Sequence, residues 1–425
     1  MQKPITETFE FFEYLHLILA YDNKIEFFLR LYMLGNLKMQ NLIKQFSKTL
    51  ILKSNYKNNL IIKQKHFENV QYLKLQTSNF FLTIMHHKLL KFDAIKNIIS
   101  KNLKALDIHY YTIENHEMKF LPKTLLYLNF NAQNFGCEGV VNLPQNLIYL
   151  YLNNGWSINN NFIQLLPKKI QYLKIKTLIT NDRNYTITHL TDLIFLKLNC
   201  GYIKTILIEN CPNLTKLNLY MNYIGNFPPS ILQLLNLKIL NLSYNEIVKI
   251  PDEISNLINL EELILCKNRI DKFSEAITLL INLKILNVSG NRIKNISNSI
   301  SQLYNLQKLN FSDNYFNEFP NEIIMLTNLQ FLDFSINKIQ NVPNSISQLQ
   351  KLQELNLNNN YIREINLNLP NLKKLNLDCN KLVQMSLETP NLNNLIVTNN
   401  KRFSLVYDEF FLNKFANCLS ENNDF

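Results

Sequence analysis

A phrase of leucines that recurs at a fixed interval constrains this chain more than any other feature. The phrase reads Leu-x-x-Leu-x-Leu-x-x-Asn-x-Ile, and one clear copy runs from Leu237 to Ile247. Further copies begin at Leu260, Leu283, Leu306, Leu329 and Leu352, and successive starts are always 23 residues apart. Such a period indicates a stack of one repeated unit, in which each unit contacts only its neighbours. We therefore expect one elongated solenoid.

Within each copy, apolar and polar residues alternate as they do in a short strand with one buried face. In the copy that starts at Leu237, Leu240 and Leu242 lie on one side of such a strand, with polar neighbours between and after them. Leu237 and Ile247 close the two ends of the strand against the same core. The sequence therefore predicts an α/β solenoid in which every unit adds one strand to a parallel sheet.

The segments between these strands are patterned too. Four of them place an apolar residue and a proline before an Ile-x-x-Leu group, at Phe227-Pro228, Ile250-Pro251, Phe319-Pro320 and Val342-Pro343. Proline can stand at the start of a helical turn without losing a hydrogen bond. We predict that each of these segments forms a single helical or 3-10 turn that buries two apolar residues.

The phrase, its period and the proline-led turns resemble the leucine-rich repeat proteins, and in particular the intracellular 23-residue class that acts as signalling scaffolds. The resemblance implies a curved horseshoe, with the parallel sheet on the concave face and short turns on the convex face. It also implies helical caps at the N-terminal and C-terminal ends.

The asparagine of the phrase has a structural explanation. It stands where the chain leaves the strand, so that its amide can bond backbone groups of adjacent bends that would otherwise be buried without a partner. Eight successive units keep it, which predicts a ladder of asparagines. Its members are Asn222, Asn245, Asn268, Asn291, Asn314, Asn337, Asn360 and Asn380.

The chain of 425 residues divides into four segments by its pattern. Residues 1–45 lack the phrase, residues 46–213 carry irregular repeats, residues 214–400 carry regular ones, and residues 401–425 form an expected capping helix and tail. Three irregular repeats begin with a leucine and a proline, at Leu121-Pro122, Leu143-Pro144 and Leu166-Pro167. These resemble FNIP repeats, which often follow F-box segments.

Residues 1–45 contain apolar residues at helical spacing, such as Phe11, Leu15 and Leu19. One interpretation is an N-terminal cap that covers the first coil of the solenoid. The other is an F-box-like adaptor segment, which would make the protein a substrate receptor of a ubiquitin ligase.

Positive charge is concentrated in the first half of the chain. The formal net charge is +11, and residues 1–213 hold 25 Lys and Arg against 14 Asp and Glu, whereas residues 214–425 hold 19 of each. Such asymmetry occurs in proteins that bind nucleic acids or anionic surfaces, and also in proteins with a lysine-rich solvated face. We favour the solvated face and keep nucleic-acid binding as an alternative.

The sequence predicts an intracellular, cytoplasmic protein without a transmembrane segment. Glu7, Glu10 and Glu13 precede the first apolar run, which is not the pattern of a secretory signal. The six cysteines are scattered and form no close pairs of the kind that staple secreted repeat proteins. No uncharged apolar stretch reaches the length of a membrane span.

No motif for catalysis, metal or cofactor binding stands out. The seven histidines have no metal-ligand spacing with cysteines or acidic residues, and the seven glycines form no phosphate-binding loop. We therefore predict a protein that is not an enzyme and holds no cofactor or metal.

The candidate binding site lies on the expected concave sheet, at the third, fifth and seventh positions of the phrase. In the later units the fifth position is mostly asparagine, which can be structural or can belong to a binding face. In the earlier units these positions combine aromatic rings with lysines, the composition that interfaces favour. The candidate residues are Tyr72, Lys74, Tyr127, Tyr149, Tyr151, Tyr172, Lys174, Lys176, Phe195 and Lys197.

From this pattern we expect a non-catalytic scaffold that binds a protein or peptide on the concave face. The lysines favour an acidic partner. The two alternatives are the ubiquitin-ligase receptor and the nucleic-acid or anionic-surface binder.

Overall fold

The computed structural model describes residues 49–54, 72–77, 90–91, 99, 101–133, 135–154, 158–176 and 182–400. The predicted caps at residues 1–45 and 401–425 lie outside these ranges. The chain forms two compact units: residues 1–112 with 120–130, and residues 113–119 with 131–425. Each unit is described by itself below.

The first unit contains parallel strands from the earliest repeats. They are β1 (Thr49–Ser54), β2 (Tyr72–Thr77), β3 (Leu90–Lys91), β4 (Ala105–Thr112) and β5 (Tyr127–Asn131), of which the last residue belongs to the second unit. Thr49 aligns with Tyr72 in the β1–β2 pair, so the register equals one 23-residue repeat. Tyr72 in turn aligns with Ala105 of β4, because a longer segment separates these two strands.

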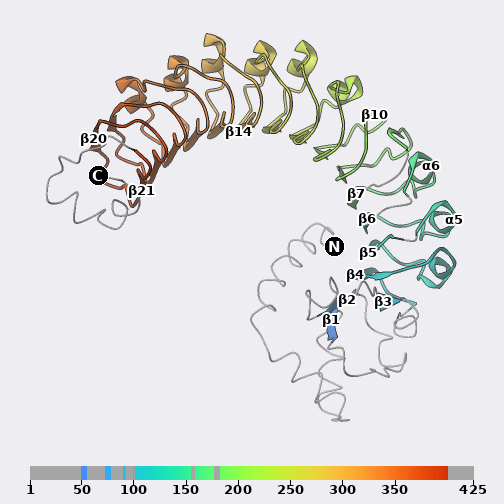
Figure 1. Cartoon of the computed structure of the whole chain (residues 1–425). Helices are drawn as coiled ribbons and strands as arrows, with labels where there is room; N and C mark the ends of the chain where they lie inside the picture. Colours follow the sequence, from blue (N-terminus) through green and yellow to red (C-terminus); the bar gives the residue numbers. More distant parts are fainter. Residues whose placement is uncertain are drawn as a thin grey trace, which may run out of the picture. The chain divides into compact units, whose positions relative to one another are not determined.

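The second unit is built on a continuous parallel sheet to which each repeat adds one strand. The strands are β6 (Tyr149–Asn153), β7 (Tyr172–Lys176), β9 (Phe195–Asn199), β11 (Lys216–Asn218), β12 (Ile239–Asn241), β13 (Glu262–Ile264), β14 (Ile285–Asn287), β15 (Lys308–Asn310), β16 (Phe331–Asp333), β17 (Glu354–Asn356), β19 (Lys374–Asn376) and β21 (Asn394–Ile396). Equivalent leucines face each other, so Leu240 aligns with Leu217 on one side and Leu263 on the other. In Figure 1 the strands of this unit follow the inner, concave side of an arc. The predicted leucine-rich repeat solenoid with a parallel sheet is confirmed.

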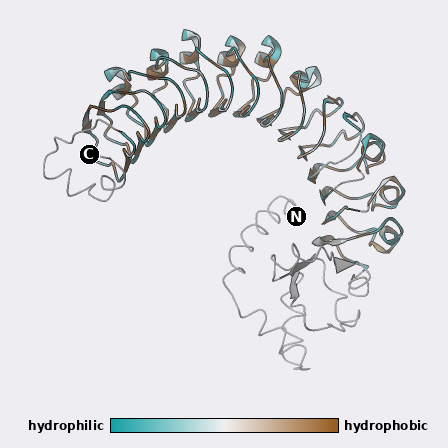
Figure 2. Cartoon of the chain, in the orientation of Figure 1, coloured by the Kyte–Doolittle hydropathy of each residue, from teal (hydrophilic) through white to brown (hydrophobic). Residues whose placement is uncertain are grey.

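Short helical turns occupy the opposite side of most coils. They are η4 (Asn115–Phe120), α5 (Cys137–Val140), α6 (Asn160–Gln164), η5 (Pro229–Gln233), η6 (Asp252–Asn256), η7 (Glu275–Leu279), η8 (Asn298–Gln302), η9 (Asn321–Met325) and η10 (Asn344–Gln348). Pro251 directly precedes η6, and the turn buries Ile254 and Leu257 against the core. Figure 2 shows that these turns carry hydrophilic as well as hydrophobic residues, as a turn with one buried side requires.

In four repeats an extended segment takes the place of the turn. β8 (Asn184–Ile187) pairs with β10 (Thr205–Ile208), and β18 (Glu364–Asn368) pairs with β20 (Gln384–Glu388), both in parallel. The repeats that begin at Leu352 and Leu372 are followed by the next after only 20 residues. An extended chain covers more distance per residue than a helical turn, so it closes the coil with fewer residues.

The asparagine at the ninth position of the phrase bonds two adjacent coils. Asn291 donates from Nδ2 to the carbonyl oxygens of Leu265 and Val288 at 3.0 and 2.9 Å, and its Oδ1 accepts from the backbone N–H of Ile270 at 3.0 Å. The equivalent bonds recur at each of the eight asparagines named above, and Asn400 makes them as well. All of these side chains are buried.

A second column of asparagines, which the sequence reasoning missed, stands just before the first leucine of the phrase. Asn259 donates to the carbonyl oxygen of Leu235 at 2.9 Å, and Asn282 donates in the same way to Ile258. The other members are Asn236, Asn305, Asn328, Asn371 and Asn391. Unlike the first ladder, these bonds lie at the protein surface. The first five, from Asn236 to Asn328, recur every 23 residues, which is visible in the sequence and could have revealed them.

The residue before each ladder asparagine adopts a left-handed backbone conformation. In the regular repeats it is Met221, Tyr244, Lys267, Gly290, Asp313, Ile336, Asn359, Cys379 or Asn399, with φ between 53° and 63°. Only glycine adopts this conformation without a steric cost, and a β-branched residue is the least suited to it. Ile336 is therefore the most strained of these residues.

Candidate binding surface

Strand register brings most of the predicted aromatic and lysine residues together on β6, β7 and β9. Tyr149 aligns with Tyr172, and Tyr172 aligns with Phe195. The rings of Tyr149 and Tyr172 stack with their centroids 4.3 Å apart, and those of Tyr172 and Phe195 are 6.4 Å apart. The third positions of these three repeats thus form one continuous aromatic row.

The aromatic side chains of this row are less exposed than protruding interface residues would be. Tyr149 is only 5% exposed, whereas Tyr172 and Phe195 are half-buried. Burial, with a smaller contribution from the adjacent Tyr172, raises the pKa of the Tyr149 phenol above its ordinary value. The Tyr149 ring is therefore a packed, buried member of the row. Tyr172 and Phe195 present the accessible aromatic surface.

Lysines flank the aromatic row. Lys174 and Lys197 stand directly opposite each other on β7 and β9, and Lys174 Nζ lies 5.4 Å from the ring centroid of Tyr151. Lys216 on β11, which the sequence reasoning did not select, aligns with Phe195 and extends the group. Strands β6, β7, β9 and β11 contain no acidic residue. Within the described residues, neither Lys176 nor Lys197 forms an ion pair.

The remaining predicted residues lie in the first unit. Tyr127 is half-buried on β5. Tyr72 and Lys74 belong to β2, and their side chains lie outside the described part of the structure. The candidate surface is therefore the part on β6, β7, β9 and β11, which we call the lysine-aromatic face.

The fifth-position asparagines bond within their own repeat. Asn287 Oδ1 accepts from the backbone N–H of Ser289 at 3.0 Å and from its hydroxyl at 2.8 Å. The same contact to the residue two positions later occurs at Asn218, Asn241, Asn310, Asp333, Asn356 and Asn376. Such side-chain bonds stabilise a turn at the end of the strand. A cross-strand amide bond occurs where Asn356 donates to Asp333 at 3.1 Å.

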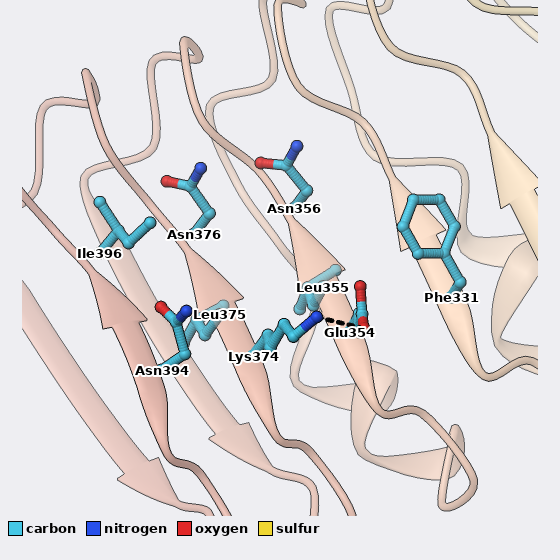
Figure 3. A pocket seen from close by; sticks show the side chains of 9 residues that line it. All are labelled: Phe331, Glu354, Leu355, Asn356, Lys374, Leu375, Asn376, Asn394 and Ile396. Atoms are coloured by element: carbon cyan, nitrogen blue, oxygen red, sulfur yellow. Dashed lines mark hydrogen bonds and ion pairs between the residues drawn. The ribbon is translucent and has the colours of Figure 1, made fainter. Parts of the chain in front are cut away.

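A shallow hollow of about 200 Å³ lies on the same sheet toward its C-terminal end, across β16, β17, β19 and β21. Figure 3 shows Phe331 on one side, Ile396 on the other, and the amides of Asn356 and Asn376 between them. Lys374 and Glu354, which also line the hollow, form an ion pair of 2.8 Å. The charges of Lys374 and Glu354 in this hollow therefore compensate each other.

Exposed aromatic residues gather where the strands end. We call this side of the second unit the exit edge, formed by the eighth and tenth positions of each phrase. Its exposed apolar and aromatic side chains are Tyr202, Met221, Tyr223, Tyr244, Tyr315, Ile336 and Tyr361. Tyr202 and Tyr223 stack at 5.5 Å between centroids. The sequence reasoning missed this surface because it examined only the positions within the strand.

In the portions that the structure covers, no group of three or more His, Cys, Asp and Glu side chains could hold a metal ion. No helix within those portions is long and apolar enough to cross a membrane.

Comparison with known proteins agrees with the repeat geometry. Residues 212–270 and 258–316 match the family model described as leucine rich repeat. The chain is a leucine-rich repeat protein. No curated protein matches this leucine-rich repeat chain.

Solved structures extend the match along the solenoid. A leucine-rich repeat protein of Leptospira interrogans is 28% identical, with 84% of this chain and 91% of that chain covered and a TM-score of 0.60. The Toll–Spatzle complex of Drosophila is 17% identical, with coverage of 83% and 57% and a TM-score of 0.58. The PEPR1–AtPEP1 structure is 17% identical, with coverage of 87% and 61% and a TM-score of 0.52. The last two likenesses show a shared fold alone.

Proposed function

We propose that this leucine-rich repeat protein is a non-catalytic scaffold that binds an acidic segment of a partner protein on the lysine-aromatic face. The observation that supports this most is the direct pairing of Lys174 with Lys197 in a region of four strands without an acidic residue. A carboxylate of a partner that approaches these strands meets lysines and no acidic side chain of the four strands, which favours an acidic ligand. The fold also supports a binding role, since a Toll–Spatzle complex has the same architecture.

The aromatic row complements the charge. Tyr172 and Phe195 are half-buried and held in place by neighbouring rings, so they lose little conformational freedom when a partner covers them. The lysines steer an acidic partner toward these rings and speed its approach. Tyr149 stacks against Tyr172 from the neighbouring strand β6. It is not itself a contact residue.

The test is quantitative affinity purification of the full chain from its native cells, in the wild type and in two charge-reversed variants. In K174E/K176E/K197E three lysines of the lysine-aromatic face become glutamates. In K249E/K272E/K294E the same number of exposed lysines outside the strands is reversed, which keeps the net charge equal. We expect specific partners to be lost only from the first variant, and their contact segments to be acidic. Equal recovery from both variants would contradict the proposal.

Truncation of one ring separates the aromatic contribution from the charge. Tyr172→Ala should weaken partner binding by roughly 2 kcal/mol, the scale of an interface hot spot. Lysine reversal should mainly slow association and reduce its salt dependence. A partner that tolerates both changes binds elsewhere.

Finer features of the sequence analysis stay predictions. They include the FNIP-like character of the irregular repeats, the scaffold subclass, the four-segment division and the intracellular location. The F-box-like interpretation concerns residues 1–45, which lie outside the described ranges. Deleting residues 1–45 and measuring whether a ubiquitin-ligase adaptor is lost from the purified complex tests it directly.

A further inference from the structure

On the exit edge, cations and aromatic rings alternate over five successive repeats at the tenth position of the phrase. The row consists of Arg292, Tyr315, Lys338, Tyr361 and Lys381, and all five side chains are exposed. It lies in the regular repeats, away from the strands that carry the lysine-aromatic face. We propose that this row is a second docking surface, which binds an acidic amphipathic helix of a partner protein.

Backbone bonds hold the members of the row side by side. The N–H of Tyr315 donates to the carbonyl oxygen of Ile293 at 2.8 Å, and the N–H of Lys338 donates to that of Phe316 at 2.8 Å. Tyr361 and Lys381 make the equivalent bonds at 2.8 and 3.0 Å. The row therefore has the rigidity of the repeat stack, although it lies outside the sheet.

The lysines of the row rest against its rings. Lys338 Nζ lies 5.7 Å from the ring centroid of Tyr315, and Lys381 Nζ lies 4.3 Å from that of Tyr361. A cation over an aromatic face keeps its charge available to a second, anionic partner. Tyr315 and Tyr361 still expose 45% and 43% of their surface, so each repeat pair offers an apolar area beside a positive charge.

Charge compensation distinguishes this row from its neighbours on the same edge. Lys267 pairs with Asp313 at 2.5 Å, and Arg269 pairs with Glu246 at 2.9 Å. By contrast, Arg292, Lys338 and Lys381 have no carboxylate within ion-pair distance among the residues that the structure describes. Three exposed, uncompensated cations on one line complement a line of carboxylates.

The spacing of the repeats favours a helix over an extended peptide. Parallel strands lie about 4.8 Å apart, so the four steps from Arg292 to Lys381 span about 19 Å. Four turns of an α-helix span about 22 Å, and long lysine side chains can absorb the difference. Side chains on one face of an extended strand recur every 6.6 Å or so, and four such steps exceed the row by about 7 Å. A helix with carboxylates and apolar residues on alternate turns therefore matches the row.

A nucleic acid is the competing occupant, since cations beside aromatic rings also bind single strands. Acidic side chains interrupt the charge of this edge, however. Asp313 stands two residues before Tyr315, and Glu318 and Glu364 are exposed close to the row in sequence. They would repel a continuous phosphate backbone, whereas a helix contacts only one face and can leave them free. The mixed charge favours the acidic helix.

The experiment selects peptides against the full chain. The probe is a displayed library of 16-residue alanine-based helices, randomised along one face. Selection is repeated on K338E/K381E, on Y315A/Y361A, and on the control K249E/K272E, which reverses two exposed lysines outside both the row and the lysine-aromatic face. We expect the wild type and the control to enrich Asp and Glu alternating with apolar residues. The K338E/K381E variant should instead enrich Lys and Arg at the same positions.

Binding of the best synthetic peptide should weaken at least tenfold in K338E/K381E and about tenfold in Y315A/Y361A, and change less than twofold in the control. Because all substituted side chains are exposed, thermal unfolding should be unchanged and serves as the folding check. Enriched peptides without an acidic excess, or peptides that bind K338E/K381E as well as the wild type, would overturn the proposal. So would loss of every selected peptide in K174E/K176E/K197E alone, which would assign them to the lysine-aromatic face. If labelled oligo-uridine binds through Lys338 and Lys381 while no peptide is enriched, the row is a nucleic-acid surface instead.

Discussion

Replacing Asn291 with alanine tests whether the buried asparagine ladder stabilises the solenoid. The side chain is 6% exposed and makes four hydrogen bonds, three from Nδ2 to the carbonyl oxygens of Leu265, Val288 and Ser289, and one from the N–H of Ile270 to Oδ1. In Asn291→Ala the Ile270 N–H is left buried without a partner, which costs about 1 to 3 kcal/mol. The carbonyl oxygens have further lone pairs and lose less. We expect a loss of about 2 to 3 kcal/mol in the free energy of unfolding.

Urea unfolding followed by circular dichroism measures this loss, with Asn282→Ala as the matched control. Asn282 belongs to the second, surface column and makes one exposed hydrogen bond, to the carbonyl oxygen of Ile258. Water can replace that bond, so the control should cost less than about 1 kcal/mol. Asn291→Asp should cost more than alanine, because a carboxylate would face three carbonyl oxygens. Equal losses for Asn291→Ala and Asn282→Ala would refute the reasoning.

Four further predictions follow from particular residues. Ile336 has φ 55° and is 51% exposed, so Ile336→Asn should raise the melting temperature by removing strain of about 1 kcal/mol, and a lowered value would contradict this. Gly290→Ala should lower it, because φ is +63° and the added Cβ would lie 2.5 Å from the Lys267 side chain. Tyr149→Ala should destabilise the fold by about 3 kcal/mol in thermal unfolding, since the ring is buried, whereas Tyr172→Ala should cost clearly less. Burial raises the pKa of the Cys211 thiol to about 11, so at pH 8 iodoacetamide should modify it far more slowly than the half-exposed Cys137, as mass spectrometry of the folded protein would show.

The repeat architecture could be predicted from the sequence because each unit places the same residue types at the same positions. The alternation at Leu240 and Leu242 predicts a strand, and the structure places Ile239–Asn241 in one. Pro251 before Ile254 predicts a turn, and η6 starts at Asp252. An asparagine recurs at the bend of each regular repeat. At Asn291 its amide bonds backbone groups of the preceding coil. Period and residue type suffice here, since each unit meets the same neighbours as the last.

Which side chains are accessible was decided only by the tertiary structure. Tyr149 and Tyr172 occupy the same position of the phrase, yet Tyr149 is 5% exposed and Tyr172 is half-buried. Tyr315 and Tyr361 lie outside the strand pattern and expose nearly half of their surface. Whether a lysine is compensated likewise depends on a carboxylate in another coil, as with Lys267 and Asp313, which are 46 residues apart. Exposure and ion pairing depend on contacts between coils, and the sequence of one repeat does not contain them.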